Sequence, residues 1–323
     1  EVIHGDYSRW VNGETLHSVT NYALHKALYS GHNDHNYFEI AHTVKYLQNM
    51  GNLDLYNFVD NHDVERIYTK LSNKAHFTPV HILLYTLPGV PSIYYGSEFG
   101  IEGRKERSSD DCLRPALSLD NYETALEDNP CTALIAALGQ IRQHTPALSY
   151  GSYAELHLTN RQFAFARDLN DVRVVVTVNN DDNAASMDLP AGNAVEYIGA
   201  LSGQKVAVQD GRINVTVPAN SGEIWVPAGD MPEYKPFKVE ISVKEETVTD
   251  EESIPADSEA PSSATEPVHF DPNKSPEDMS VAELQAAILA KMANNGPVSD
   301  QMKKTVNENI WHDSLVNWLK SFR

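Results

Sequence analysis

One stretch of this sequence, FVDNHD at residues 58–63, joins an apolar run to four consecutive polar groups. The run begins at Leu53, and its aliphatic and aromatic side chains predict a short buried strand. Two carboxyl groups, an amide and an imidazole cannot lie unpaired in a dry core, so we expect them where the strand ends. In α/β folds the carboxyl ends of the strands are where active sites are built. A polar turn with local side-chain hydrogen bonds explains the same residues equally well.

A second motif, LPGVPSIYYGSEFG, occupies residues 87–100. Its proline and glycine residues predict a helix end and a tight turn, followed by a short apolar strand and a glycine-rich loop. Residues 76–87 between the motifs are mostly apolar and predict a helix. A strand, a helix and a strand at this spacing make a βαβ unit, so we expect the two strands to be parallel neighbours.

With both motifs in this order, the chain resembles the α-amylase superfamily, glycoside hydrolase family 13. In that family a segment ending NHD closes the seventh barrel strand, and the pattern GVPxIYYG forms the eighth. Residues 1–4, EVIH, resemble the fifth-strand motif of the family, and residues 16–21 resemble the sixth strand. The resemblance implies an α/β fold that is the second half of a (β/α)8 TIM barrel. On this interpretation the chain is a fragment that begins inside a longer enzyme.

Four regions follow from the patterns along the chain. Residues 1–148 are expected to form the barrel half, with helices at 22–30 and 37–48 and a polar loop between them. Residues 149–228 contain short strand-like runs between turn signals, which predict an antiparallel β-sandwich similar to the C-terminal domain of the family. Residues 229–272 are rich in acids, proline and serine and predict a disordered linker.

Residues 273–323 predict a helical hairpin as a C-terminal extension. Ser280 and Glu283 form a capping box at the start of the first helix, and a second amphipathic region begins near Ser299. Two such helices are too few for a core of their own. We therefore expect this extension to dock on the barrel or on another subunit.

Composition and charge exclude several classes of partner. The net charge of −20 argues against nucleic acid, since phosphate contacts need clustered lysine and arginine. No apolar run has the length of a membrane span. Cys112 and Cys131 do not make a disulfide framework, and two free thiols favour a cytoplasmic location, with secretion as the alternative. His32 and His35 lack a third ligand at a recognisable spacing, so no metal site is predicted.

The resemblance implies roles for the polar residues. Glu1 would be the acid that protonates the departing glycosidic oxygen and later activates water, and Asp63 the carboxylate that binds sugar hydroxyls and favours the distorted ring. His62 would donate a hydrogen bond to the same sugar, and His4 would also contact substrate. The alternative role for Asp63 is a cap of the following turn.

Asp110 and Arg114 resemble the pair that holds a more distant sugar in the family, although a surface ion pair accounts for them too. The nucleophilic aspartate of the fourth strand would precede residue 1, and Ser97 stands where many relatives have aspartate. We therefore expect the chain alone to be inactive. No cofactor is expected in it, while calcium is possible in the complete protein.

The predicted function is retaining hydrolysis of α-1,4-glucosidic bonds in starch-derived oligosaccharides, as in enzymes of the α-amylase or maltodextrin-degrading type. Two alternatives remain open. The first is α-glucan transglycosylation, because a sugar hydroxyl can replace water as the acceptor. The second is a non-catalytic carbohydrate-binding relative of the family.

Overall fold

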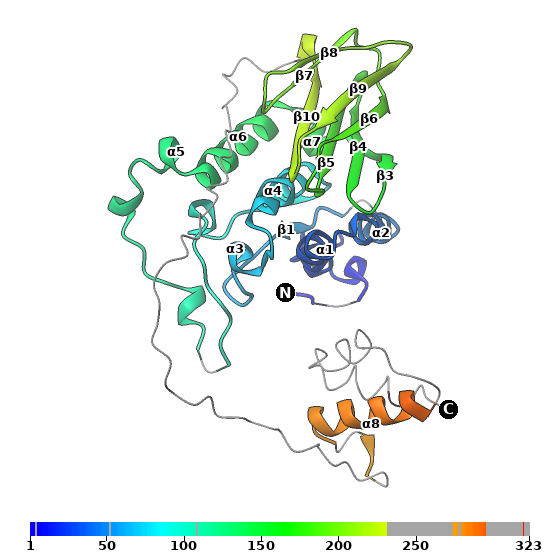
Figure 1. The fold of residues 1–323 in the computed structure, drawn as a ribbon. Helices are drawn as coiled ribbons and strands as arrows, with labels where there is room; N and C mark the ends of the chain where they lie inside the picture. The colour runs from blue at the N-terminus through cyan, green and yellow to red at the C-terminus, as the bar shows by residue number, and fades with distance from the viewer. Residues whose placement is uncertain are drawn as a thin grey trace, which may run out of the picture. The chain divides into compact units, whose positions relative to one another are not determined.

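The computed structural model describes residues 1–3, 5–51, 53–107, 109–230, 274–276, 279–294 and 319. These residues belong to two compact units, one within residues 1–246 and one within 247–323 (Figure 1). The first unit combines a layer of helices and short parallel strands with two antiparallel sheets.

The predicted βαβ unit is confirmed. Strands β1 (Tyr56–Phe58) and β2 (Val90–Ser92) pair in parallel, with Tyr56 opposite Val90, and helix α4 (Phe77–Thr86) connects them. A parallel bridge also joins Thr20 to Tyr56, so three chain segments lie side by side in sequence order. The regular part of β1 is shorter than the apolar run from Leu53 to Val59 suggested.

The helical layer begins with α1 (Tyr22–Asn33) and α2 (Tyr37–Gln48). The polar loop predicted between them is wrong in its first half, because residues 31–33 form the last turn of α1. Gly31 allows the close crossing there, since an added Cβ would lie 2.9 Å from Cγ1 of Ile40. His32 is fully buried, with Nδ1 bonded to the Leu28 carbonyl and Nε2 to the Tyr37 hydroxyl.

The other helices of the first unit are short, apart from α6. Asn129 caps α6 as its sequence predicts, because its side chain accepts from the N–H groups of Cys131 and Thr132 at 2.9 and 3.3 Å. Cys112 and Cys131 are free thiols, as expected. The remaining helices are α3 (Ile67–Lys70), α5 (Ala125–Asp128), α6 (Pro130–His144) and α7 (Pro146–Tyr150).

Antiparallel sheets were expected in residues 149–228, and they are confirmed. One sheet has the strand order β3-β4-β5-β10-β7-β8, and β6 pairs with β9 in the other. The strands are β3 (Ser152–Leu158), β4 (Gln162–Leu169), β5 (Val172–Asn179), β6 (Ala185–Pro190), β7 (Glu196–Gly199), β8 (Lys205–Ala207), β9 (Arg212–Val217) and β10 (Ser221–Pro227).

The central strands of the larger sheet, β4, β5 and β10, are buried on both faces. One face shares a core with β6 and β9, in which Met187, Val215 and Trp225 pack together. Its other face packs on the helices, where Phe163 and Val176 join one apolar cluster with residues of α1, α4 and α6. The sheets and the helical layer therefore fold around a shared core.

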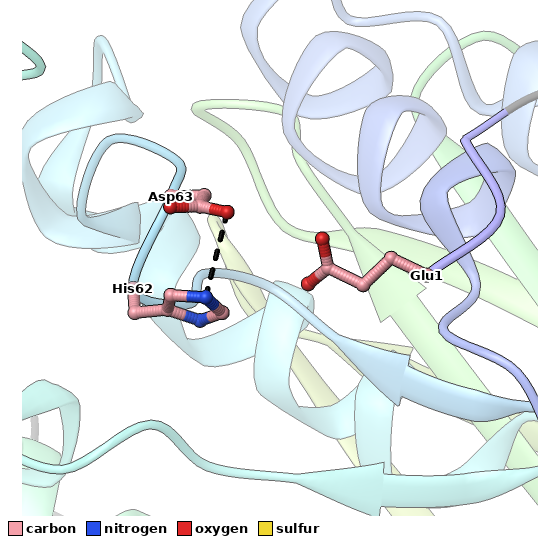
Figure 2. A group of neighbouring side chains, drawn as sticks. All are labelled: Glu1, His62 and Asp63. Carbon is pink, nitrogen blue, oxygen red and sulfur yellow. Dashed lines mark ion pairs between the residues drawn. The ribbon is translucent and has the colours of Figure 1, made fainter.

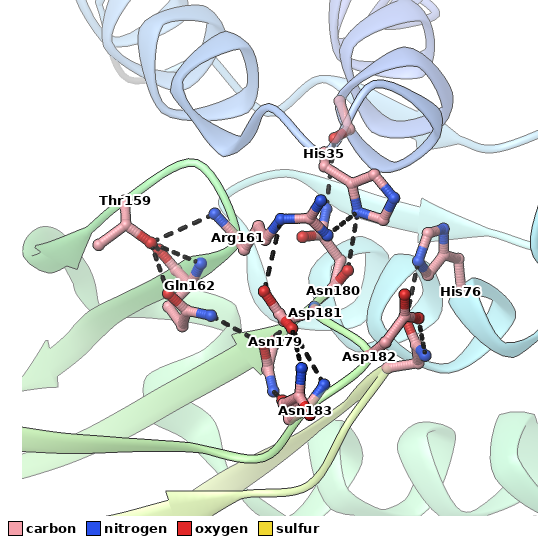
Figure 3. Close-up of polar contacts among 12 residues, drawn as sticks. His35, His76, Thr159, Arg161, Gln162, Asn179, Asn180, Asp181, Asp182 and Asn183 are labelled. Atoms are coloured by element: carbon pink, nitrogen blue, oxygen red, sulfur yellow. Dashed lines mark hydrogen bonds and ion pairs between the residues drawn. The ribbon is translucent and has the colours of Figure 1, made fainter.

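Polar contacts also join the two layers at one edge (Figure 3). His35 Nδ1 lies 2.8 Å from the Asn180 carbonyl oxygen, and Arg161 Nη1 lies 2.9 Å from the same imidazole nitrogen. His76 Nε2 lies 2.9 Å from Oδ1 of Asn220. Nδ1 of His35 and Nε2 of His76 thus serve the contact between layers.

In the second unit, helix α8 spans Val281–Asn294. The predicted capping box is confirmed, because Ser280 N donates to Glu283 Oε2 at 2.7 Å and Glu283 N donates to Ser280 Oγ at 3.3 Å. The predicted second helix lies outside the described residues, Leu319 excepted. Of the predicted linker, only Gly229 and Asp230 are described, and they end a short 3-10 helix, Ala228–Asp230. Among the residues described, no helix combines the length and apolar character that a membrane crossing requires.

Candidate active site

The turn after β1 is fixed by Asn61. Its Oδ1 accepts hydrogen bonds from the backbone N–H of Asp63 at 2.9 Å and of Val64 at 3.1 Å, while its Nδ2 donates to the Tyr22 hydroxyl at 3.2 Å. This is a local side-chain turn of the kind that asparagine forms. The turn directs His62 and Asp63 away from the core. The predicted polar turn is therefore confirmed, while the active-site role of these residues stays a prediction.

Glu1, His62 and Asp63 converge beyond the end of β1. One donor atom from each of the three side chains lies within 4.8 Å of the other two. His62 Nε2 is 3.4 Å from Asp63 Oδ2, and the Glu1 side chain points toward both residues (Figure 2). The structure therefore brings together three residues to which the resemblance assigns contacts with substrate. Glu1 and His62 are exposed, so the group is open to a ligand from solvent.

Arg114 connects this group to the loop after β2. Its Nη2 donates to Asp63 Oδ1 and to Asp110 Oδ2, both at 2.9 Å, and its Nε donates to the His62 carbonyl at 3.0 Å. The predicted Asp110–Arg114 pair is thus formed, but Arg114 also touches the carboxylate of Asp63, which the sequence did not indicate. A hydrogen bond from Lys105, with the charges of Lys105 and Arg114, lowers the pKa of Asp110.

Tyr22 is a neighbour of the site that sequence reasoning missed. Burial raises the pKa of its hydroxyl, and the nearby carboxylates of Glu1 and Asp63 raise it further. Its position directly after the capping residue Asn21, at the end of the strand-like segment 16–21, was the available signal. His4, the remaining predicted substrate contact, lies outside the described residues.

Within the described part of the chain, Glu1, His62 and Asp63 are the group that meets the spacing of a metal site. Calcium prefers a cage of oxygen ligands, whereas one of these three donors is an imidazole nitrogen. The guanidinium of Arg114 also places a positive charge against Asp63. These residues do not fit calcium.

Comparisons with known proteins agree with this geometry. Residues 1–151 match the family described as "Alpha amylase, catalytic domain", and residues 151–225 match "Alpha-amylase C-terminal domain". The two matches are contiguous and include the converging group and both antiparallel sheets. Residues 1–225 therefore belong to the α-amylase family, glycoside hydrolase family 13.

Individual relatives are distant in sequence. Neopullulanase 2 of Thermoactinomyces vulgaris is 26% identical over 235 residues, which are 69% of this chain and 39% of the relative. A cyclomaltodextrin glucanotransferase of Niallia circulans is 28% identical over 180 residues, or 53% of this chain and 24% of the relative. The cyclomaltodextrinase of Thermoanaerobacter pseudethanolicus is 28% identical over 187 residues, which are 56% of this chain and 31% of the relative.

Solved structures show the same fold. An α-amylase from Malbranchea cinnamomea superposes with a TM-score of 0.62 at 21% identity, covering 72% of this chain and 51% of that one. The structure of AmyP in complex with maltose superposes with a TM-score of 0.61 at 12% identity, covering 70% of this chain and 54% of that one. This chain spans 24 to 39% of the length of the curated relatives and about half of these structures.

Proposed function

We propose that this chain carries part of the active site of a retaining glycoside hydrolase that cleaves α-1,4-glucosidic bonds in starch-derived oligosaccharides. The supporting observation is the convergence of Glu1, His62 and Asp63 within 4.8 Å at the end of β1. Membership of the α-amylase family supports an α-glucan as the substrate.

The three side chains divide the chemistry according to their types. Glu1 protonates the departing glycosidic oxygen and then removes a proton from the incoming water. Asp63 accepts hydrogen bonds from sugar hydroxyls and stabilises positive charge that develops on the ring. His62, 3.4 Å from Asp63, donates to the same sugar. Asp110 and Arg114 hold a more distant sugar, and Arg114 orients Asp63 as well.

We further propose that residues 1–148 are the second half of a (β/α)8 barrel. The parallel order of Thr20, Tyr56 and Val90, with helices between successive segments, supports this arrangement. Retention requires a carboxylate nucleophile about 5–5.5 Å from the acid. On our proposal that nucleophile belongs to a part of the complete protein that precedes Glu1, and residues 1–323 alone do not turn over substrate.

Product stereochemistry of the complete protein tests this proposal. With maltotriose or pullulan as substrate, we expect newly formed reducing ends in the α configuration by NMR. Glu1→Gln and Asp63→Asn should each lower kcat by about 10²- to 10⁴-fold. Asp188→Asn, an exposed change on β6 at an ion pair with Arg212, should leave kcat unchanged. Products of inverted configuration would exclude the mechanism.

Transfer in place of hydrolysis is a second candidate. The specific observation in its favour is the 28% identity to a cyclomaltodextrin glucanotransferase. A transferase would release longer or cyclic oligosaccharides from maltotriose, whereas a hydrolase would release glucose and maltose. Chromatography of early products from the complete protein distinguishes the two.

A further inference from the structure

Three polar side chains lie buried beneath the turn that carries His62 and Asp63. Asp60 and Ser97 are each 2% exposed, and Arg66 is fully buried. Ser97 Oγ donates to the Asp60 carboxylate, with distances of 2.9 and 2.7 Å to its two oxygens. Asp60 Oδ2 also accepts from the N–H of Ile67 at 2.8 Å. Burial raises the pKa of Asp60, as expected for a carboxyl group removed from water.

Arg66 uses this buried position to bind three backbone segments. Its Nη1 donates to the Tyr95 carbonyl at 2.5 Å, and its Nη2 donates to the Leu113 carbonyl at 2.8 Å. The backbone N–H of Arg66 donates to the Gly103 carbonyl at 3.0 Å. An added Cβ at Gly103 would lie 2.9 Å from Arg66 Cγ, so glycine permits this close approach. Arg66 therefore fastens the segments around residues 95, 103 and 113 to the turn of Asp63.

The Leu113 contact leads directly to the candidate active site. Leu113 precedes Arg114, whose guanidinium contacts Asp63 Oδ1 and the His62 carbonyl. We infer that Arg66 is a positioning residue, which holds the Leu113 backbone so that Arg114 keeps the Asp63 carboxylate in place for the sugar. The consequence for turnover rests on the proposed function, while the positioning itself does not.

Lysine cannot take over this role. Its single ammonium is a point donor, whereas the planar guanidinium spans the Tyr95 and Leu113 carbonyls at once. Arg66→Lys should therefore release the segment of Arg114 while retaining the positive charge beside Asp60. Arg142 offers a matched control, because it also donates to backbone carbonyls, of Tyr85 at 2.6 Å and of Gly89 at 2.7 Å. Gly89 precedes β2 and Tyr95 follows it, so Arg142 binds the end of the strand away from the site.

Hydrogen exchange of the complete protein, followed by mass spectrometry, tests the positioning without any substrate. We expect peptides covering residues 109–116 to exchange about tenfold faster in Arg66→Lys than in the parent protein. Arg142→Lys should leave those peptides unchanged. Arg66→Gln, whose one side-chain amide cannot span the Tyr95 and Leu113 carbonyls, serves if Arg66→Lys does not fold and should also increase exchange. Unchanged exchange in the folded variants would overturn the inference.

Kinetics supply the second readout. If Arg66 acts through Arg114, Arg66→Lys and Arg114→Ala should each lower kcat/KM, and the double variant should be no worse than the poorer single variant within about twofold. If the fold losses in kcat/KM of the two single variants multiply in the double variant, Arg66 acts independently of Arg114 and the positioning role is refuted. If the complete parent protein does not turn over any glucan, the proposed function is contradicted. The exchange experiment would still decide the role of Arg66.

Discussion

Nη2 of Arg114 lies 2.9 Å from Oδ1 of Asp63, across 51 positions of sequence. The contact joins the loop after β2 to the turn after β1, so two strand ends contribute to one charged group. Arg114 and Asp63 are 45% and 41% exposed, which leaves the pair accessible to a sugar. A bound hydroxyl would therefore meet a carboxylate that is already oriented.

The first prediction concerns Arg114→Ala. Arg114 makes two exposed ion pairs, each of which contributes at most about 1 kcal/mol, so the free energy of unfolding should fall by about 2 kcal/mol or less. The loss of orientation at Asp63 should lower kcat/KM of the complete protein by about tenfold, or ~1.4 kcal/mol. Arg212→Ala removes an ion pair of similar exposure on β9 and should leave kcat/KM unchanged. Equal kinetic losses in both variants would contradict the role of Arg114.

The second prediction tests the buried carboxyl group. Ser97→Asp places a second carboxylate against Asp60 and should destabilise the protein by about 3 kcal/mol or more, because two like charges cannot share the site. Adding Asp60→Asn should restore most of that loss, since the amide can accept from the Ile67 N–H and donate to the new carboxylate. Urea unfolding of the two variants measures the rescue. A double variant no more stable than Ser97→Asp would show that Asp60 and Ser97 do not act as a unit.

Short-range signals in the sequence predicted much of this architecture. The two motifs at residues 58–63 and 87–100 predicted parallel neighbours, and Asn129 predicted the start of α6. The sheets were predicted from recurring strand-like runs between turn signals. Alternation of buried and exposed residues in β9 is the clearest such pattern, with Ile213, Val215 and Val217 facing the core.

Two kinds of contact were beyond these signals: contacts across long sequence separations, and local contacts that satisfy a buried polar side chain. Arg66 looks like one more charged residue after the NHD motif, and only the folded chain brings it to Leu113, 47 positions away. His32 was placed in a polar loop because its neighbours Asn33 and Asp34 are polar. The carbonyl of Leu28 and the hydroxyl of Tyr37 satisfy the imidazole inside the core, and that compensation is invisible in sequence.

The third prediction concerns the entry to β2. Gly89 has φ +112°, and an added Cβ would lie 2.7 Å from both the Leu55 carbonyl and Asn57 Nδ2. Gly89→Ala should therefore destabilise the protein by about 2–3 kcal/mol, because the backbone cannot yield easily. Gly139→Ala is the control, since no atom lies within 4 Å of its added Cβ in α6. It should stabilise by about 0.5–1 kcal/mol, and thermal unfolding of both variants separates backbone strain from helix propensity.

The fourth prediction concerns stability against pH. Burial lowers the pKa of His32 and of His25 from 6.5 to about 3, and that of His81 to about 4. Each folded-state pKa lies below the unfolded one, so the stabilisation is complete above about pH 6.5 and is lost as the pH falls. Each histidine should lower the free energy of unfolding by about 1.4 kcal/mol per pH unit between about pH 6 and 4.

Burial raises the pKa of the carboxyl groups of Asp60 and Glu223, so these two groups change the stability with pH in the opposite direction. A variant of one histidine separates the histidine effect from theirs. His81 lies in the apolar helix α4, with Nδ1 bonded only to the Phe77 carbonyl within that helix. His81→Leu should therefore keep its stability near pH 7 and reduce the slope of unfolding free energy against pH by about 1.4 kcal/mol per unit. Urea unfolding of the parent protein and of His81→Leu at about pH 7, 6 and 5 gives the slope of unfolding free energy against pH for each. Identical slopes would mean that His81 is protonated equally well in the folded and unfolded chain.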